Sequence, residues 1–303
     1  MPLLVLTSAL WTQVAPPPGD GLSALLASGA EPVRIAGDRA FTEGPICDAV
    51  GNLFFSDIPA NGILKLTPEG DLSVFRTDSG GANGLTFDRE GRMLACEGTS
   101  RRVSRLEADG TWSTIADRYD GRPLNSPNDL YMVADGTLYF TDPRFGSRDG
   151  MEQVGESGRI VEAVYQLKPD GTLTRVVSDM TLPNGLIVTA DGKTLLVADS
   201  GELNVGTYPI AEDGTVGEGR LFAETKAEGD GVPDGITLDE RGNLYVTSVG
   251  GIWVFDPGGR HLGTIGFPEI PANCAFGGHT LYATARTSVY KLEMQVGGVE
   301  PYH

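Results

Sequence analysis

Short runs of alternating apolar and polar residues fill the chain, and tight turns separate them. In one such stretch Ile236 and Leu238 alternate with polar neighbours, an Arg-Gly-Asn turn follows, and two further apolar runs end at residue 255. Alternation with a period of two predicts strands that bury one face. The stretch therefore predicts a small antiparallel meander with a carboxylate, Asp234, at its entrance.

The same pattern occurs six times along the chain. Each copy begins with an acidic or amide residue, continues through an apolar strand, and turns into a second strand at a glycine-containing turn. The opening residues are Glu43, Asn83, Asn128, Asn184, Asp234 and Asn273. They are about 40 to 55 residues apart, and a repeat of this length with several short strands in each unit is typical of a β-propeller. Six units predict six blades.

The repeats predict an all-β chain with a single six-bladed β-propeller domain at 32–303, preceded by an N-terminal segment at 1–31. The strand expected at 32–36 should pair with blade six, because this closure removes an open sheet edge. The blades are expected at 41–76, 82–116, 125–178, 182–223, 233–266 and 273–294. Blade three contains the one long insertion, residues 144–158, which is polar and glycine-rich. An insertion of this kind is expected to form a lid over a site.

The chain begins with a short apolar run at residues 3–11. The run is too short to span a bilayer as a helix, so no integral membrane segment is expected. It resembles the apolar region of a secretory signal peptide with a cleavage site near Ala15, although no Lys or Arg precedes it. We expect a periplasmic or secreted protein if this segment is cleaved, and a cytoplasmic one otherwise.

Charge and cysteine content narrow the possible partners. The sequence has 23 basic and 41 acidic residues, a formal net charge of −18. Such a charge disfavours nucleic acid and anionic membrane surfaces, and it is compatible with a divalent cation and a small substrate. Cys47, Cys96 and Cys274 form no CxxC pair, and their spacing leaves open whether two of them are bridged. We expect a monomer or a weak dimer.

The six opening residues carry the candidate chemistry. The innermost strands of a propeller start at the same end of the central channel, so their opening residues should form a ring around the axis. All six have a side-chain oxygen, and Glu43 and Asp234 are carboxylates. Carboxylate and amide oxygens are ligands of hard cations, and a ring without His or Cys disfavours zinc. The sequence therefore predicts a metal site in the central channel for one divalent cation, with calcium preferred over magnesium, manganese or zinc.

Four of these segments resemble motifs of the senescence marker protein-30/gluconolactonase family. They are Phe41-Thr42-Glu43-Gly44-Pro45, Ser126-Pro127-Asn128-Asp129, Leu182-Pro183-Asn184-Gly185 and Val232-Pro233-Asp234-Gly235. The segment 273–278 is similar to the blade-six motif of bacterial members. The resemblance covers nearly all of residues 41–285 and implies a six-bladed propeller with an axial divalent metal that hydrolyses sugar lactones. The chain departs from many members at Cys47, where they have Trp, and this leaves the exact substrate open.

The resemblance also implies roles for individual residues. Glu43, Asn184 and Asp234 would be metal ligands, and Asn128 would be a fourth ligand or a substrate contact. Asn83 and Asn273 share the register of the ring, but the family gives them no comparable role.

Three further residues flank the blade-three motif. Arg122, Asn125 and Arg144 are candidates for binding substrate hydroxyl groups, together with Asn128. The alternative for each arginine is an ordinary solvated loop position.

These residues predict a metal-dependent, gluconolactonase-like hydrolase that opens a small lactone or ester. A cation would polarise the lactone carbonyl and lower the pKa of a bound water. Asp234 would take the proton of the water or attack directly, and Asn128 would help to hold the oxyanion. Relatives that hydrolyse organophosphates imply an alternative activity on the same metal site. A second alternative is a non-enzymatic propeller that binds a partner and keeps the ion for stability.

Overall fold

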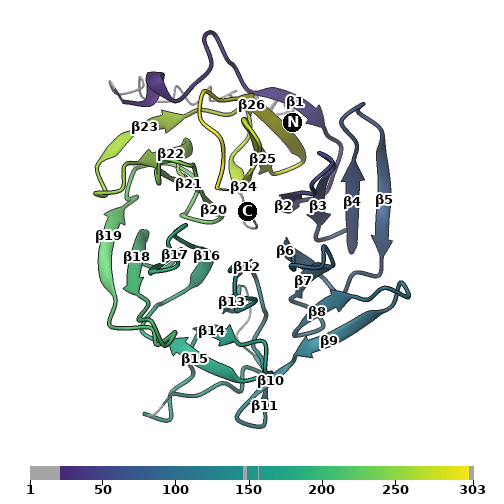
Figure 1. Ribbon diagram of the computed structural model, residues 1–303, viewed down its shortest axis with the longest axis vertical. Helices are drawn as coiled ribbons and strands as arrows, with labels where there is room; N and C mark the ends of the chain where they lie inside the picture. Colours follow the sequence, from purple (N-terminus) through teal and green to yellow (C-terminus); the bar gives the residue numbers. More distant parts are fainter. Residues whose placement is uncertain (1–20, 146–148, 156, 300–303) are drawn as a thin grey trace, which may run out of the picture.

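The computed structural model describes residues 21–145, 149–155 and 157–299. Within these residues the chain forms six four-stranded antiparallel sheets around a central axis (Figure 1). The structure therefore confirms the prediction of an all-β, six-bladed propeller. The apolar run at 3–11 and the cleavage site expected near Ala15 lie outside the described residues.

Each blade is a meander whose first strand lies nearest the axis. From the axis outwards, the strands of blades one to three are β2 (Thr42–Cys47), β3 (Leu53–Asp57), β4 (Gly62–Leu66) and β5 (Leu72–Thr77); β6 (Ala82–Phe87), β7 (Met93–Glu97), β8 (Arg102–Leu106) and β9 (Trp112–Ala116); and β12 (Leu130–Met132), β13 (Leu138–Asp142), β14 (Ala163–Leu167) and β15 (Leu173–Val177). A two-stranded hairpin, β10 (Arg118–Tyr119) and β11 (Arg122–Pro123), connects blades two and three.

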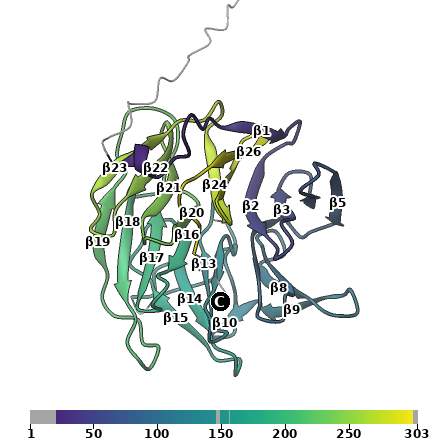
Figure 2. The same ribbon diagram turned by 45° about the horizontal axis from the view of Figure 1, so that its top comes forward.

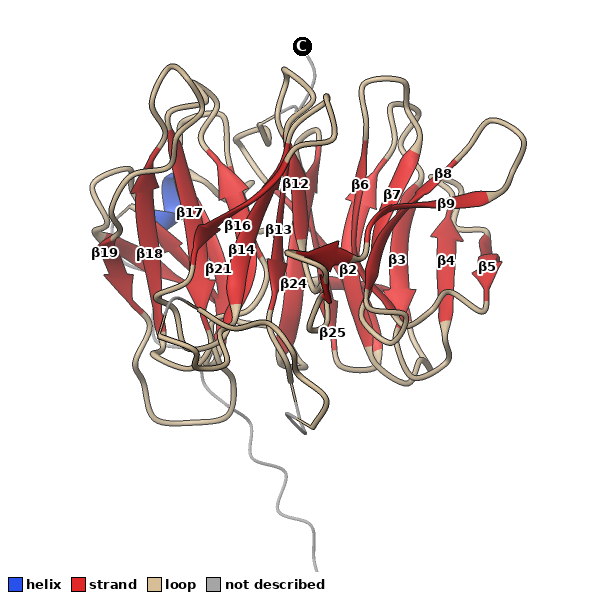
Figure 3. Ribbon diagram, turned by 90° about the horizontal axis from the view of Figure 1, so that it is seen from below, coloured by secondary structure: helices blue, strands red, loops and turns tan. Residues whose placement is uncertain are grey.

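Blades four to six repeat this arrangement. Their strands are β16 (Pro183–Val188), β17 (Thr194–Asp199), β18 (Asn204–Pro209) and β19 (Arg220–Glu224); β20 (Ile236–Leu238), β21 (Leu244–Ser248), β22 (Gly251–Phe255) and β23 (His261–Ile265); and β24 (Pro271–Gly277), β25 (Thr280–Ala285) and β26 (Ser288–Glu293). Viewed from the side, the strands run between two faces that are covered by loops (Figure 3).

The ring is closed by the strand nearest the N-terminus. β1 (Val33–Ala36) pairs antiparallel with β26 as the outer strand of blade six, with Val33 opposite Lys291. Figures 1 and 2 show β1 beside β26 at the rim. The pairing confirms the predicted closure, in which residues from both ends of the propeller complete one sheet and remove an edge.

The core consists of six apolar clusters, one between each pair of neighbouring blades. Between blades one and two, for example, Phe54 and Ile63 pack against Leu85 and Met93. The second strand of a blade is buried on both faces, and all five residues of β3 are buried. This burial explains why the strand begins with a continuous apolar run, Leu53 to Phe55, instead of alternating.

A short segment that precedes β1 packs onto the propeller. The single-turn 3-10 helix η1 (Leu22–Ala24) places Leu22, with the following Leu25, against Leu262 and Ile265.

The described residues contain no helix long and apolar enough to cross a membrane. Cys47, Cys96 and Cys274 form no disulfide bond.

The last described residues cross the channel mouth opposite the starts of the inner strands. Gly298 N–H donates to Gly278 O, and Val299 N–H donates to Leu238 O, at 3.0 and 3.1 Å. Glu240 N–H donates to Gly297 O at 2.8 Å. Since these bonds join the ends of β20 and β24, residues 297–299 tie blade five to blade six.

Candidate active site

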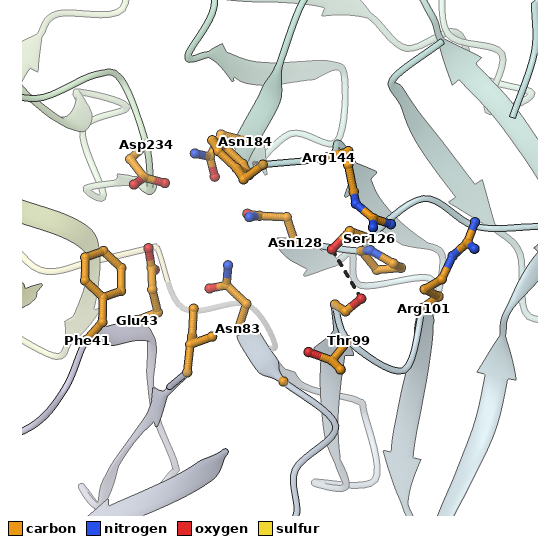
Figure 4. Close-up of a pocket in the computed structure, with 15 residues that line it drawn as sticks. Phe41, Glu43, Asn83, Thr99, Arg101, Ser126, Asn128, Arg144, Asn184 and Asp234 are labelled. Carbon is orange, nitrogen blue, oxygen red and sulfur yellow. Dashed lines mark hydrogen bonds between the residues drawn. The ribbon is translucent and has the colours of Figure 1, made fainter. Parts of the chain in front are cut away.

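A cavity of about 640 Å³ lies at the end of the channel where the innermost strands begin (Figure 4). Its walls come from blades one to five. The structure brings Glu43, Asn128, Asn184 and Asp234 together in this lining, so the four residues proposed as ligands share one cavity. Asn83 also lines it, whereas Asn273 does not.

Irregular strand pairing aims these side chains at the axis. The pairing of β2 with β3 shifts register between Glu43 and Ile46, and that of β16 with β17 shifts between Pro183 and Leu186. A bulge in an antiparallel pair re-aims a side chain that would otherwise follow the pleat. In blades three and five the corresponding residues, Asn128 and Asp234, lie just before the first strand begins.

The glycine that follows several of these residues allows neighbouring inner strands to approach closely. Gly185 N–H donates to Asp234 O at 3.1 Å, and Gly84 N–H donates to Asn128 O at 2.8 Å. A Cβ atom on Gly185 would lie 2.3 Å from Asp234 O, which is inside the contact distance. The glycine that follows Asn184 is therefore required for close packing around the axis.

Gly185→Ala should lower the free energy of unfolding by about 1–3 kcal/mol, since the methyl group collides with a backbone carbonyl that cannot move alone. The same shift would displace Asp234 and lower activity. Urea denaturation measures the first effect. Gly62→Ala is the matched control, because its Cβ would meet no atom closer than 3.4 Å. Equal losses in the two variants would contradict the close-packing explanation.

The carboxylates at the axis are held in an unfavourable environment for their charge. Burial, and next the negative charge of Asp234, raises the pKa of Glu43 well above its ordinary value. Burial and the charge of Asp129 raise the pKa of Asp234, and a hydrogen bond from Asn184 offsets only part of this. Clustered buried carboxylates of this kind are stabilised when a cation binds between them.

The amide side chains are oriented in a way that suits a cation. Asn184 Nδ2 donates to Ser200 Oγ at 3.0 Å, and Ser200 Oγ donates in turn to Pro233 O at 2.7 Å. This leaves the Asn184 Oδ1 atom as the free end of the amide. Asn83 Oδ1 is buried and has no hydrogen-bond partner among the described residues. Two carboxylates and outward amide oxygens fit a hard cation such as calcium or magnesium.

The proposed cation site needs amide side chains as well as carboxylates for its ligands. Within the described ranges, no group of three or more His, Cys, Asp and Glu side chains is arranged to hold a metal ion. The four proposed ligands include only two carboxylates, Glu43 and Asp234, so Asn128 and Asn184 would have to complete the shell.

Sequence reasoning gave no role to Asp129, the third carboxylate near the axis. Burial raises its pKa to about 6, and Asn273 Nδ2 donates to its Oδ2 at 3.3 Å. Asn273 thus contacts a carboxylate instead of lining the cavity. The available signal was the Asn128-Asp129 pair, in which an acid replaces the glycine that follows four of the opening residues.

The three residues proposed to contact substrate hydroxyls have different positions. Arg144 lines the cavity, whereas Arg122 is exposed in β11 and lies outside the lining. Asn125 is fully buried, also outside the lining, and its Nδ2 donates to Asp142 O and Val161 O at 3.1 and 3.0 Å. Of the three, only Arg144 is placed to meet a ligand in this cavity.

Asp142 fixes the chain that leads into the blade-three motif. Its carboxylate accepts hydrogen bonds from Asn125 N–H and Ser126 N–H, both at 2.7 Å. Burial raises the pKa of Asp142 to about 7, and these two bonds act against the rise. Because Asn128 follows two residues later, this carboxylate holds the segment that presents Asn128 to the cavity.

The insertion of blade three contributes one wall. Arg144 and Phe145 line the cavity, and Gln153 Nε2 donates to Arg122 O and Pro123 O at 2.9 Å. Residues 146–148 lie outside the described residues. The insertion thus borders the cavity, and its role as a closing lid stays a prediction.

Arg101 also lines the cavity, and sequence reasoning did not single it out. It lies in the turn between β7 and β8 with a φ of 55°. Asn61 and Leu203 have similar φ values of 53° and 57° at the corresponding turns of blades one and four. The left-handed backbone is therefore a feature of the blade turn, and the side chain alone distinguishes Arg101.

Comparison with known proteins identifies related sequences and structures. The family model described as the SMP-30/Gluconolactonase/LRE-like region matches residues 41–287. A gluconolactonase from Zymomonas mobilis is 32% identical over 290 residues, which cover 87% of this chain and 81% of the relative. The pentonolactonase XacC from Haloferax volcanii is 27% identical over 253 residues, with 80% of each chain covered.

The solved structures include a similar protein, the gluconolactonase XC5397 from Xanthomonas campestris. It superposes with a TM-score of 0.82 at 32% sequence identity, covering 93% of this chain and 98% of that chain.

Proposed function

The chain belongs to the SMP-30/gluconolactonase/LRE-like family, and we propose that it is a cation-dependent enzyme that hydrolyses sugar lactones. The observation that carries the proposal is the meeting of Glu43, Asp234 and the amides of Asn128 and Asn184 in one cavity at the propeller axis. A volume of about 640 Å³ is within the range of small-molecule sites. Lactone-hydrolysing relatives over most of the chain support the reaction class.

Glu43, Asn184 and Asp234 would hold the cation, with Asn128 as a fourth ligand or a substrate contact. A bound divalent cation supplies Lewis acidity, which polarises a carbonyl group and makes water more acidic. Asp234 lies partly open to the cavity and can accept a proton from water that attacks the carbonyl carbon, after which the ring C–O bond breaks and the ring oxygen leaves with a proton. In the alternative, Asp234 attacks the carbonyl carbon itself, the ring oxygen leaves, and water hydrolyses the resulting anhydride to release the acid and free Asp234. Asn128 can donate a hydrogen bond from its amide to the oxygen on which negative charge develops.

A purely structural role of the cation is less compatible with these positions. The charge of Asp234 raises the pKa of Glu43, burial and the charge of Asp129 raise the pKa of Asp234, and the environment of both carboxylates therefore disfavours ionisation. A scaffold would gain stability from neutral residues at both sites. Retention of two carboxylates beside an open cavity is expected where charge is needed for chemistry.

Proton release on a panel of substrates tests the proposal. The panel contains D-glucono-1,5-lactone, an aryl acetate and a phosphotriester, each assayed with calcium, magnesium, manganese or zinc. We expect lactone opening to exceed aryl ester hydrolysis by at least about tenfold in kcat/KM. Turnover of the phosphotriester alone would replace lactone hydrolysis with the organophosphate alternative. No turnover of any substrate, with a metal bound, would favour a binding protein.

A further inference from the structure

The cavity has a second chemical character at the end away from the proposed ligands. Figure 4 shows Asp234, Asn184 and Glu43 at one end and the guanidinium groups of Arg144 and Arg101 at the other. Two cationic side chains in the lining are unexpected in a chain with a formal net charge of −18.

Each guanidinium group donates a hydrogen bond to a backbone carbonyl of the segment that leads into the blade-three motif. Arg101 Nε donates to Leu124 O at 2.5 Å, and Arg144 Nη1 donates to Asn125 O at 3.2 Å. Arg144 Nη2 also donates to a backbone carbonyl, Asp149 O, at 3.3 Å.

Arg101 retains unused hydrogen-bonding capacity. Its Nη2 atom is buried and has no hydrogen-bond partner among the described residues. Its Nη1 atom lies 3.8 Å from Glu152, a carboxylate whose side chain is half exposed. A buried guanidinium nitrogen without an acceptor carries a free-energy cost, and an anionic ligand would remove this cost if the Arg101 side chain turned that nitrogen toward the cavity.

Three acidic residues, Glu152, Glu162 and Asp142, lie in this region. Glu162 accepts a hydrogen bond from Arg144 N–H at 3.0 Å, and Asp142 is occupied by two backbone donors. Neither Glu162, Asp142 nor Glu152 lines the cavity. The cavity lining therefore contains two arginines at this end and two carboxylates, Glu43 and Asp234, at the axis.

We propose that Arg101 and Arg144 form an anion subsite, so that the preferred substrate is a lactone with a carboxylate or phosphate at the end remote from its ring carbonyl. The inference rests on the proposed lactonase function and specifies its substrate class. The acidic axis would take the lactone group with the cation, while the arginines would bind the anionic end and fix the orientation of the chain. Arginine suits both anions because its planar donors match carboxylate and phosphate oxygens.

Two pairs of substrates that differ only in this group test the subsite. The carboxylate pair is D-glucaro-1,4-lactone and D-glucono-1,4-lactone, and the phosphate pair is 6-phospho-D-glucono-1,5-lactone and D-glucono-1,5-lactone. The wild type should turn over one anionic lactone with a kcat/KM at least about tenfold above its neutral partner. The pair that shows the preference identifies the anion. Equal values within both pairs would overturn the inference.

Arg144→Gln should lower kcat/KM for the preferred anionic lactone, mainly through KM, by about tenfold more than it lowers kcat/KM for the neutral partner. Arg122→Gln is the matched control, because Arg122 is exposed and outside the cavity. Arg101→Gln also removes the bond to Leu124, so Arg144→Gln is the deciding variant. An equal loss for both members of the pair would show that Arg144 acts only on the fold or on catalysis, and would overturn the subsite.

Binding measurements separate a failed subsite from a failed function. If the wild type opens none of the four lactones, the proposed function is wrong, and calorimetric titration then tests the subsite alone. Tighter binding of D-glucarate or 6-phospho-D-gluconate than of D-gluconate, lost in Arg144→Gln, would uphold an anion subsite. Equal binding of all three acids by the wild type would overturn it.

Discussion

Replacement of Asp234 by Asn should lower kcat/KM for lactone hydrolysis by at least about a thousandfold and yet stabilise the metal-free protein. Activity falls because the variant loses a carboxylate that serves both as proton acceptor and as cation ligand, and acid–base groups alone contribute about 10²–10⁴. Stability rises because a neutral amide is buried in place of a carboxylate beside Asp129 and Glu43.

The stability gain should depend on pH in a defined direction. The folded protein raises the pKa of Asp234 above the value of 3.8 that it has in the unfolded chain. As pH rises above about 4, the unfolded chain loses its proton first, so the wild type becomes progressively less stable. The Asp234→Asn variant has no carboxyl group at this position, so it does not lose stability in this way as pH rises. Its advantage in the metal-free state should therefore be small at pH 5 and reach about 0.5–2 kcal/mol at pH 9.

Urea denaturation of chelator-treated protein at both pH values measures this difference. Asp170→Asn is the matched control, because Asp170 is a fully exposed turn residue, and its pKa is lowered mainly by hydrogen bonds from Thr172. An active Asp234→Asn enzyme would exclude the proposed mechanism. A metal-free variant less stable than the wild type at pH 9 would show that the carboxylate is not under electrostatic strain.

The fold was predictable because its information is local and repeated. Each blade has its own turn residues and apolar strands, and six copies of a weak pattern make a strong one. The closure by β1 also followed, because an unpaired edge strand is unfavourable. In contrast, residues 297–299 were not expected to pair with Gly278 and Leu238, since main-chain hydrogen bonds leave no pattern in the side chains.

The candidate site was predictable only in part. Register alone placed the six opening residues on one ring, and it gave no reason for Asn273 to turn toward Asp129 while Asn83 lines the cavity. Those directions depend on bulges that the sequence does not reveal. Arg101 was missed for another reason: it lies in a turn of blade two, and only the packing of blades two and three brings it to Leu124.

Removal of the cation should abolish turnover completely and lower the melting temperature, while the propeller still unfolds in one cooperative transition. The six apolar clusters between blades do not include the axial residues, so the core survives without the ion. The carboxylates of Glu43 and Asp234 then repel each other without compensation. A ligand at a hundred times its Kd stabilises a folded protein by about 2.7 kcal/mol, which predicts a clear shift on adding calcium back.

Activity and thermal stability should be followed together during chelation and during titration with calcium, because only their joint response separates catalysis from stabilisation. Both should recover along one binding curve in the wild type, since the same ligands serve both effects. In Asp234→Asn the melting temperature should respond far less to calcium, as one of two carboxylates is gone. Recovery of the melting temperature without recovery of turnover would assign the ion a structural role. Full activity after chelation would remove the cation from the mechanism and leave Asp234 as the sole nucleophile or base.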